Sequence, residues 1–165
     1  MIIRWLTAFV ILPFNVLLVI PGLLLRLFAG GPWTHDWASP ASPVGLLAMA
    51  LASAGLTLAA WTVVLFVRYG DGTAAPWDPP KNFVVRGPYR FVRNPMLLSV
   101  LLLQAAEATF ARSWPLCGWL AVFMTANLLY IPLVEEPGLA ARFGADYLRY
   151  KASVPRWIPR PTAYR

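Results

Sequence analysis

The chain has 165 residues, of which 59% are hydrophobic and 13% are charged, and its formal net charge is +7. A soluble domain is about half apolar and about a quarter charged, so this composition excludes an ordinary soluble fold. The Lys and Arg residues lie between long apolar runs, which is typical of a membrane protein rather than a nucleic-acid-binding one. The single Cys117 lies inside an apolar run, which excludes a disulfide framework, and no metal site is predicted.

Two apolar runs occupy the first half of the chain. Residues 5–25 contain two prolines and one asparagine, which a membrane helix tolerates, and the run is longer than the apolar core of a signal peptide. We therefore expect a retained span. Residues 44–67 carry no charge. Their small residues recur at helical spacing and predict a face for close helix packing (Gly45, Ala48, Ala52, Gly55 and Ala59).

A polar, proline-rich connection, residues 68–94, separates these runs from the second half and carries five cations. A connection of this length is long for a turn, and long connections are usually functional. It leads into two further apolar runs, residues 95–110 and 114–134, which are joined by a short turn and should form an antiparallel hairpin. The prediction is one all-α integral membrane domain over residues 1–165 with about four transmembrane helices.

The distribution of cations predicts the orientation of these spans. With four crossings, the N-terminus, the connection and the tail lie on one side of the membrane. That side holds twelve of the 14 Lys and Arg, leaving only Arg26 and Arg112 opposite. By the positive-inside rule, we expect both termini to be cytoplasmic, and we expect the membrane to be a prokaryotic inner membrane.

The tail, residues 135–165, has a helical pattern of its own. Pro137 is a favourable first helical residue, and four apolar or aromatic positions follow at spacings of four, four and three (Leu139, Phe143, Tyr147 and Tyr150). This pattern predicts a C-terminal amphipathic helix that lies on the membrane surface.

Polar residues concentrate where the last two spans meet the cytoplasmic face. Because the hairpin is antiparallel, Arg93 and Asn94 should face Glu135 and Glu136. Cationic donors beside acidic acceptors suit a ligand that has a carboxylate, an amine and hydroxyl groups, a description that S-adenosylmethionine fits. The chain lacks a G-x-G-x-x-G motif after a strand, so a Rossmann-type site is excluded and such a cofactor would bind among helices.

These segments resemble two motifs of the isoprenylcysteine carboxyl methyltransferase family. Residues 87–96, with sequence GPYRFVRNPM, resemble its G-x-Y-x-x-x-R-H-P-x-Y signature. Residues 135–159 resemble its E-E-x-x-L-x-x-x-F-G-x-x-Y-x-x-Y-x-x-x-V-P-R-x-x-P tail. Members of this family, which are also similar to phospholipid N-methyltransferases, are membrane enzymes that enclose S-adenosylmethionine between the last two helices and the tail. A lipophilic acceptor reaches the methyl group from the bilayer.

The resemblance implies a cofactor pocket and two catalytic residues, Glu135 and Arg93. The residues that it places at the cofactor are Val85, Tyr89, Arg93, Asn94, Pro95, Leu97, Glu135, Glu136 and Tyr147. Two of them depart from the signature: Asn94 replaces a His and Leu97 replaces a Tyr.

The sequence leaves the acceptor open. Carboxyl methylation of an isoprenylcysteine-like group needs no base, whereas methylation of a phospholipid amine would use Glu135 or Glu136. A non-catalytic member that binds a lipid or another partner is the third alternative. Arg86 and Arg90 are interpreted either as pocket residues or as juxtamembrane cations that contact anionic lipid, and Glu136 either as a ligand or as a helix start.

Overall fold

The computed structural model describes residues 10–33, 36–71 and 81–164, and every regular element in these ranges is a helix. The predicted span residues 5–9 and the connection residues 72–80 lie outside them. In chain order the elements are η1 (Val10–Val19), α2 (Ile20–Leu27), α3 (Pro43–Leu65), η2 (Phe66–Gly70), η3 (Gly87–Arg90), α4 (Pro95–Ala111), α5 (Trp114–Tyr130), η4 (Ile131–Glu135) and α6 (Glu136–Ser153).

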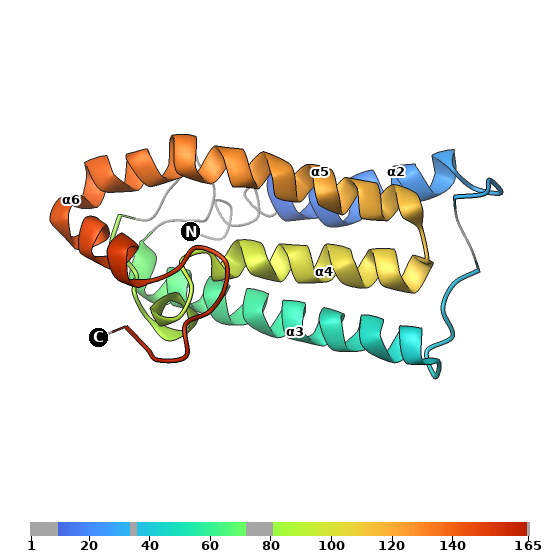
Figure 1. The fold of residues 1–165 in the computed structure, drawn as a ribbon, viewed down its shortest axis with the longest axis horizontal. Helices are drawn as coiled ribbons and strands as arrows, with labels where there is room; N and C mark the ends of the chain where they lie inside the picture. The colour runs from blue at the N-terminus through green and yellow to red at the C-terminus, as the bar shows by residue number, and fades with distance from the viewer. Residues whose placement is uncertain (1–9, 34–35, 72–80, 165) are drawn as a thin grey trace.

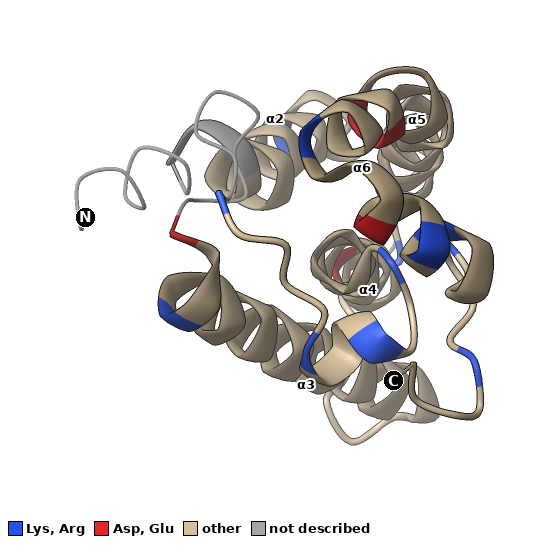
Figure 2. Ribbon diagram, turned by 90° about the vertical axis from the view of Figure 1, so that its left-hand side faces the viewer, with Lys and Arg blue, Asp and Glu red and all other residues tan. Residues whose placement is uncertain are grey.

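The molecule is an elongated bundle whose two ends differ. Helices α2, α3, α4 and α5 run along the long axis, and α4 packs against both α3 and α5 (Figure 1). At one end α6, η3 and the C-terminal residues 154–164 fold over the bundle. Lys and Arg residues gather at this end (Figure 2), which we call the basic end.

Helices α3 and α4 approach closely because α3 presents small residues to α4. A Cβ atom on Gly55 would lie 2.9 Å from Leu103 Cγ and 3.1 Å from the Ser99 carbonyl oxygen, so no side chain fits there. Ala48 is also buried on α3. The close packing face that the sequence predicted is thus confirmed at its centre. Ser42 begins α3, because its Oγ accepts a hydrogen bond from the Gly45 N–H at 3.0 Å.

The α4–α5 hairpin is closed at the end opposite the basic end. Arg112 ends α4 in the left-handed conformation with φ 47°, and α5 begins two residues later. The loop before α3 is tied to the hairpin, because the Ala38 N–H donates to the Phe110 carbonyl at 2.8 Å. Within the bundle the Trp119 indole N–H donates to the Val16 carbonyl at 3.0 Å, which fixes η1 against α5.

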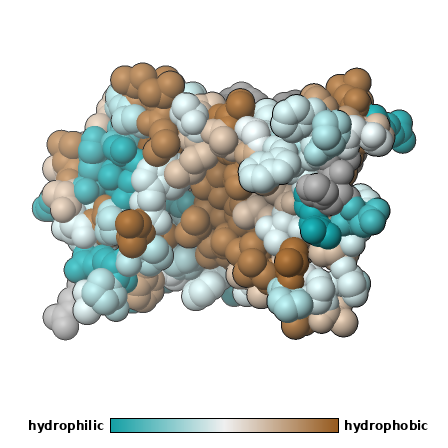
Figure 3. All heavy atoms as spheres, turned by 45° about the vertical axis from the view of Figure 1, so that its right-hand side comes forward, coloured by the Kyte–Doolittle hydropathy of each residue, from teal (hydrophilic) through white to brown (hydrophobic). Residues whose placement is uncertain are grey.

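Two helices of the described residues, rather than the four predicted, are long and apolar enough to span a membrane: Pro43–Gly70 and the helix that begins at Trp114. Pro95 starts α4 and the left-handed Arg112 ends it after 17 residues, which is about 25 Å and less than a bilayer core of about 30 Å. Near the N-terminus the described residues contain a shorter apolar helix, Pro13–Leu27. The face drawn in Figure 3 nevertheless carries a hydrophobic region at its centre, between more hydrophilic patches at the left and right.

The tail helix differs from its prediction in two ways. Pro137 lies in the first turn of α6, but it does not begin a separate helix, because α5, η4 and the first part of α6 are continuous from Trp114 up to the non-helical Gly144. The wider π-type turn of η4, which contains Pro132, carries the helix past both prolines. The sharp bend lies instead at Gly144, whose φ of 54° and ψ of −131° favour glycine.

Beyond this bend the apolar face of α6 packs on the chain itself. Tyr147, Tyr150 and Val154 are buried against Phe83 and Val85 of the connection. The second half of the predicted apolar face, Tyr147 and Tyr150, is therefore buried by the chain itself, whereas Leu139 and Phe143 are half-buried.

Candidate functional site

The C-terminal residues after α6 are bound along the connection that precedes α4. Three backbone N–H groups link the two segments: Arg93 donates to Pro155, Arg160 to Phe91 and Tyr164 to Arg90, at 2.9, 3.0 and 2.8 Å. Inside this contact the buried Tyr150 hydroxyl donates to the Tyr89 carbonyl at 2.6 Å. These bonds hold the start of α4 against the end of α6, so residues far apart in sequence form one site.

Glu136 is the centre of this site and is bound by three cations. Its Oε1 lies 2.8 Å from Arg93 Nη1 and 2.7 Å from Arg156 Nε, and its Oε2 lies 2.8 Å from Lys151 Nζ. The Glu136 side chain is only 3% exposed and that of Arg93 11%. We call these four residues the Glu136 cluster. Because three cations surround one carboxylate, the cluster has excess positive charge.

The electrostatics of the cluster favour the ionised carboxylate. Burial by itself raises the pKa of Glu136, but hydrogen bonds from Arg156 and Lys151 and the charges of Arg93 and Arg156 outweigh burial and lower it. The same hydrogen bond raises the pKa of Arg156. Glu136 is therefore a fixed anion that organises the cations rather than a group that exchanges a proton near neutral pH.

Glu135, the neighbouring residue, is in a different state. It is half-buried, and its side chain forms no hydrogen bond or ion pair with another described residue. Burial raises its pKa, and the charge of Glu136 adds to this effect. The two adjacent carboxyl groups thus have opposite pKa shifts, and Glu135 is the one available to a ligand or a proton.

Two buried donors in this region have no partner among the described residues. Arg93 Nε and Trp157 Nε1 are both buried and make no hydrogen bond to that part of the chain. Buried N–H groups without partners are uncommon because leaving one unsatisfied costs about 1–3 kcal/mol. Trp157 directly follows Arg156, and the Arg156 carbonyl accepts a weak 3.4 Å hydrogen bond from Asn94 Nδ2. The site therefore has donor capacity that the protein itself does not use.

An aromatic cluster lies beside the Glu136 cluster. The Phe83 ring stacks on Phe143 at 5.1 Å and meets Tyr147 and Tyr150 edge-on at 6.0 and 5.2 Å. Burial raises the pKa of Tyr147, and the charge of Glu136 raises it further while Arg93 opposes the rise. Tyr147 is therefore a neutral, buried phenol next to the ion pairs.

The structure brings together only some of the residues that the sequence proposed. Arg93 meets Glu136 directly, as the antiparallel hairpin predicted, and Asn94 contacts the tail through the Arg156 carbonyl. The buried Tyr89 ring packs on Leu65 and Val84, its carbonyl accepts the Tyr150 hydroxyl, and burial raises its pKa, to which the charges of Tyr150 and Glu135 add.

The remaining sequence candidates have mainly apolar surroundings. Pro95 is fully buried at the first turn of α4, and Leu97 is half-buried on the same turn. Val85 packs with the aromatic cluster. The side chains of all three residues can make apolar contacts but no hydrogen bonds.

Three residues of the site were missed as candidates. Arg156 and Trp157 lie within the tail motif, so the motif itself was a signal for them. Lys151 carries no comparable signal, because it reaches Glu136 only after the bend at Gly144.

Comparison with known proteins adds one finding. The family model for phospholipid methyltransferase matches residues 43–146, which is more than half of the chain and contains Arg93, Glu135 and Glu136. The chain matches no curated protein and no solved structure in these comparisons.

Proposed function

The chain belongs to the phospholipid methyltransferase family, and on that premise we propose that it is a membrane-bound methyltransferase that uses S-adenosylmethionine. The observation that carries the proposal is the Glu136 cluster, in which three cations share one carboxylate and the buried Arg93 Nε makes no hydrogen bond to another described residue. Such a site can bind an anionic group and hydrogen-bond acceptors of a ligand. An ion pair that only stabilised the fold would need neither the excess positive charge nor an unused donor.

The residues of this site suit the polar groups of the cofactor. Arg93 Nε and the excess cationic charge match its carboxylate, and the free carboxyl group of Glu135 matches its amino group. The half-buried Val85, which packs on the aromatic cluster, would supply apolar surface for an adenine ring. The cofactor would supply an electrophilic methyl group on a sulfonium centre.

In this proposal the protein mainly orients the reactants. Glu136 fixes Arg93, and Pro95 and Asn94 fix the start of α4, so the donors are held in place before ligands bind. Preorganisation of this kind can contribute about 7–11 kcal/mol to a displacement reaction. Glu135 would accept a proton from an amine acceptor, because its raised pKa brings it closer to neutral pH. A carboxyl acceptor would need no base.

For the acceptor we propose a lipophilic molecule that enters from the bilayer, and a phospholipid amine is the first candidate because of the family match. An isoprenylcysteine-like carboxyl group is the alternative, supported by the resemblance of residues 87–96 and 135–159 to that family. Asn94 and Leu97 replace a His and a Tyr at the corner nearest to α4, so this corner is where the acceptor should differ. A non-catalytic member that binds lipid or a partner is the remaining alternative.

We propose four membrane crossings in a single domain, with both termini in the cytoplasm of a prokaryote. The short α4 can cross if the bilayer thins locally or if residues that flank it reach the interface. The basic end would then contact the cytoplasmic leaflet, where cations are favoured (Figure 2).

Calorimetric titration of the purified protein with S-adenosylhomocysteine tests the cofactor. We expect binding to the wild type and at least about ten-fold weaker binding to Arg93→Ala and Glu135→Gln, since each loses a charged contact. Arg149→Gln is the matched control, because Arg149 pairs with Asp146 on the exposed surface and both side chains are more than two-thirds exposed. No binding to the wild type would overturn the proposal.

A labelled-methyl assay then separates the acceptors. Transfer to phosphatidylethanolamine would support the phospholipid amine, and transfer to a prenylcysteine analogue would support the carboxyl group. If the cofactor binds and neither acceptor is labelled, the two named acceptors are wrong.

A further inference from the structure

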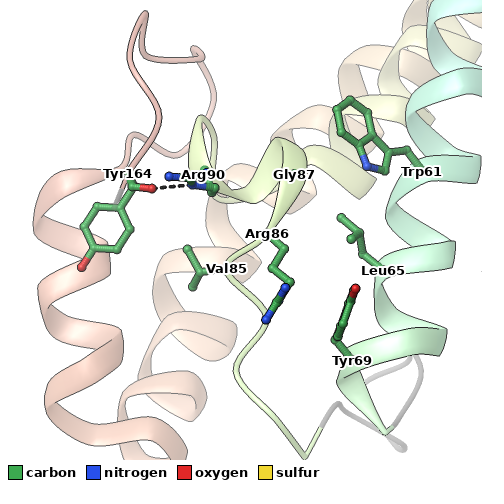
Figure 4. Close-up of a pocket in the computed structure, with 8 residues that line it drawn as sticks. All are labelled: Trp61, Leu65, Tyr69, Val85, Arg86, Gly87, Arg90 and Tyr164. Atoms are coloured by element: carbon green, nitrogen blue, oxygen red, sulfur yellow. Dashed lines mark hydrogen bonds between the residues drawn. The ribbon is translucent and has the colours of Figure 1, made fainter.

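A second polar site lies at the basic end, on the side of the connection that faces α3. It is a pocket of about 560 Å³ between α3, η3 and the C-terminal residues. Trp61, Leu65 and Tyr69 line it from α3 and η2, Arg86 and Arg90 line it from the connection, and Tyr164 lines it from the tail (Figure 4). None of these residues belongs to the Glu136 cluster, and the lining residue that the pocket shares with the proposed cofactor site is Val85.

The two arginines of this pocket have no acidic partner among the described residues. Arg86 is exposed, and its guanidinium lies 4.4 Å from the centre of the Tyr69 ring, with no hydrogen bond in the described part of the chain. Arg90 uses Nε to bind the Tyr164 carbonyl at 2.6 Å, which leaves its two terminal nitrogens for another acceptor. The pocket therefore has two cations and no acidic side chain paired with them among the described residues.

The position of the pocket indicates what kind of anion it would bind. Trp61 and Leu65 lie on the last turns of α3, a helix long and apolar enough to span the membrane, and the arginines follow on the polar connection. The pocket thus lies where this apolar helix meets the basic end. At that depth in a membrane protein the abundant anions are lipid phosphates, which guanidinium groups bind with several hydrogen bonds.

We propose that this pocket binds the phosphate of a membrane phospholipid between Arg86 and Arg90, with the acyl chains along the exposed side of α3 near Trp61. Gly87 is part of this arrangement. A Cβ atom on it would lie 2.9 Å from Trp61 Nε1, so the absence of a side chain lets η3 sit against α3. Tyr69 and Trp61 supply the amphipathic rings that are favoured at head-group level.

This proposal stands apart from the proposed methyltransferase activity, because it needs only the membrane location. Val85 and Tyr164 both line the pocket and pack against the Tyr147, Tyr150 and Val154 cluster on their other side. The two sites are therefore neighbours that share a wall.

The test is calorimetric titration of the full-length protein, in neutral detergent, with the short-chain lipid dihexanoylphosphatidylglycerol. We expect saturable binding to the wild type, and at least about ten-fold weaker binding to Arg86→Gln and to Arg90→Gln, since each loses charged hydrogen bonds. The control Arg149→Gln removes an equal charge at the same end but outside the pocket, so its affinity should be unchanged. Equal affinity in all four proteins would overturn the proposal.

Three further ligands define the chemistry. Dihexanoylglycerol, which lacks the phosphate, should bind at least about ten-fold more weakly, and inorganic phosphate, which lacks the chains, should also bind more weakly. Octanoate carries a carboxylate; if it or dihexanoylglycerol binds as tightly as the phospholipid, the phosphate assignment is wrong. If inorganic phosphate binds as tightly, the site takes free phosphate and the lipid assignment is wrong.

Folding and the cofactor are measured on the same preparations. Arg90 also holds Tyr164, so its variant can lose stability; in that event Arg86→Gln and Arg90→Lys carry the test, with Arg90→Lys expected to retain more binding than Arg86→Gln. Lipid binding without S-adenosylhomocysteine binding would overturn the proposed function and support the lipid proposal. S-adenosylhomocysteine binding without lipid binding would overturn the lipid proposal alone.

Discussion

The connection before α4 places its arginines in two unlike surroundings. Arg93 is 11% exposed and bonded to Glu136, within a cluster where every cation has a carboxylate partner. Arg86 and Arg90 line an open pocket without an acidic partner among the described residues. The first arrangement holds the α4 and α6 ends together, whereas the second leaves charge free for a ligand. The same residue type is therefore ion-paired with a carboxylate at Arg93, where the proposed function adds a contact with the cofactor, and has no acidic partner among the described residues at Arg86 and Arg90.

The largest expected effect is the loss of the central carboxylate. Glu136→Gln leaves Arg93, Arg156 and Lys151 facing one another without an anion, and breaking a buried ion pair costs about 3–5 kcal/mol. Because Lys151 and Arg156 are partly exposed, we expect the lower end, about 3 kcal/mol, as a loss in the free energy of unfolding.

Thermal or denaturant unfolding in detergent measures this loss. Asp146→Asn is the matched control, since it removes the carboxylate of an exposed pair and should change the stability by less than about 0.5 kcal/mol. Arg86→Gln should be equally mild. A similar loss of stability in all three variants would show that the Glu136 cluster contributes no more to the fold than exposed charges do.

The next largest loss of stability is expected at Gly87, which lines the proposed lipid pocket. Gly87 has φ 54°, and a Cβ atom there would lie 2.9 Å from Trp61 Nε1 and 3.0 Å from Leu65 Cδ1, closer than van der Waals contact. Gly87→Ala should therefore cost about 2 kcal/mol of stability, of which the left-handed backbone alone accounts for about 1–2 kcal/mol. Gly144→Ala is the control for the backbone term, because Gly144 also has φ 54° but no atom within 4 Å of a Cβ.

Equal losses in these two glycine variants would show that contact with α3 contributes nothing. A larger loss of stability in Gly87→Ala, together with weaker lipid binding, would show that the contact of η3 with α3 supports the lipid pocket.

The sequence predicted more of the Glu136 cluster than of the proposed lipid pocket. An antiparallel hairpin returns Glu136 to Arg93, so that contact follows from connectivity and motif spacing alone. The pocket depends on how η3 docks against α3, which rests on the missing side chain at Gly87 and on tertiary contacts that no local pattern encodes.

The tail helix and the span count were the least predictable features. Local propensity placed a helix start at Pro137, but the π-type turn of η4 carried the helix past it and a glycine conformation set the bend at Gly144. The four-span prediction counted apolar length without the helix ends, and Pro95 and Arg112 make α4 shorter than a typical crossing. Helix ends and bends are decided by single residues, so periodicity locates them poorly.

A smaller effect should appear in acid. The pKa of Glu136 is lowered in the folded protein, so its contribution to stability is present above the unfolded glutamate pKa of about 4.3 and is lost as the pH falls through the folded value. Wild-type stability should therefore fall more steeply below about pH 4 than that of Glu136→Gln, which lacks the titrating group. Unfolding free energies measured at several pH values test this, and parallel curves would exclude the cluster as the cause.

The smallest effect comes from the neighbouring residue and has the opposite sign. Glu135 has a raised pKa because of burial and the adjacent charge of Glu136, so its ionised form opposes folding at neutral pH. Glu135→Gln should leave the stability unchanged or raise it by less than about 1 kcal/mol, while Glu136→Gln lowers it. If Glu135 serves the cofactor, the same variant should also weaken S-adenosylhomocysteine binding. A stability gain coupled to a binding loss is typical of a group kept for function, whereas a loss of stability in Glu135→Gln would mean that Glu135, like Glu136, holds the fold.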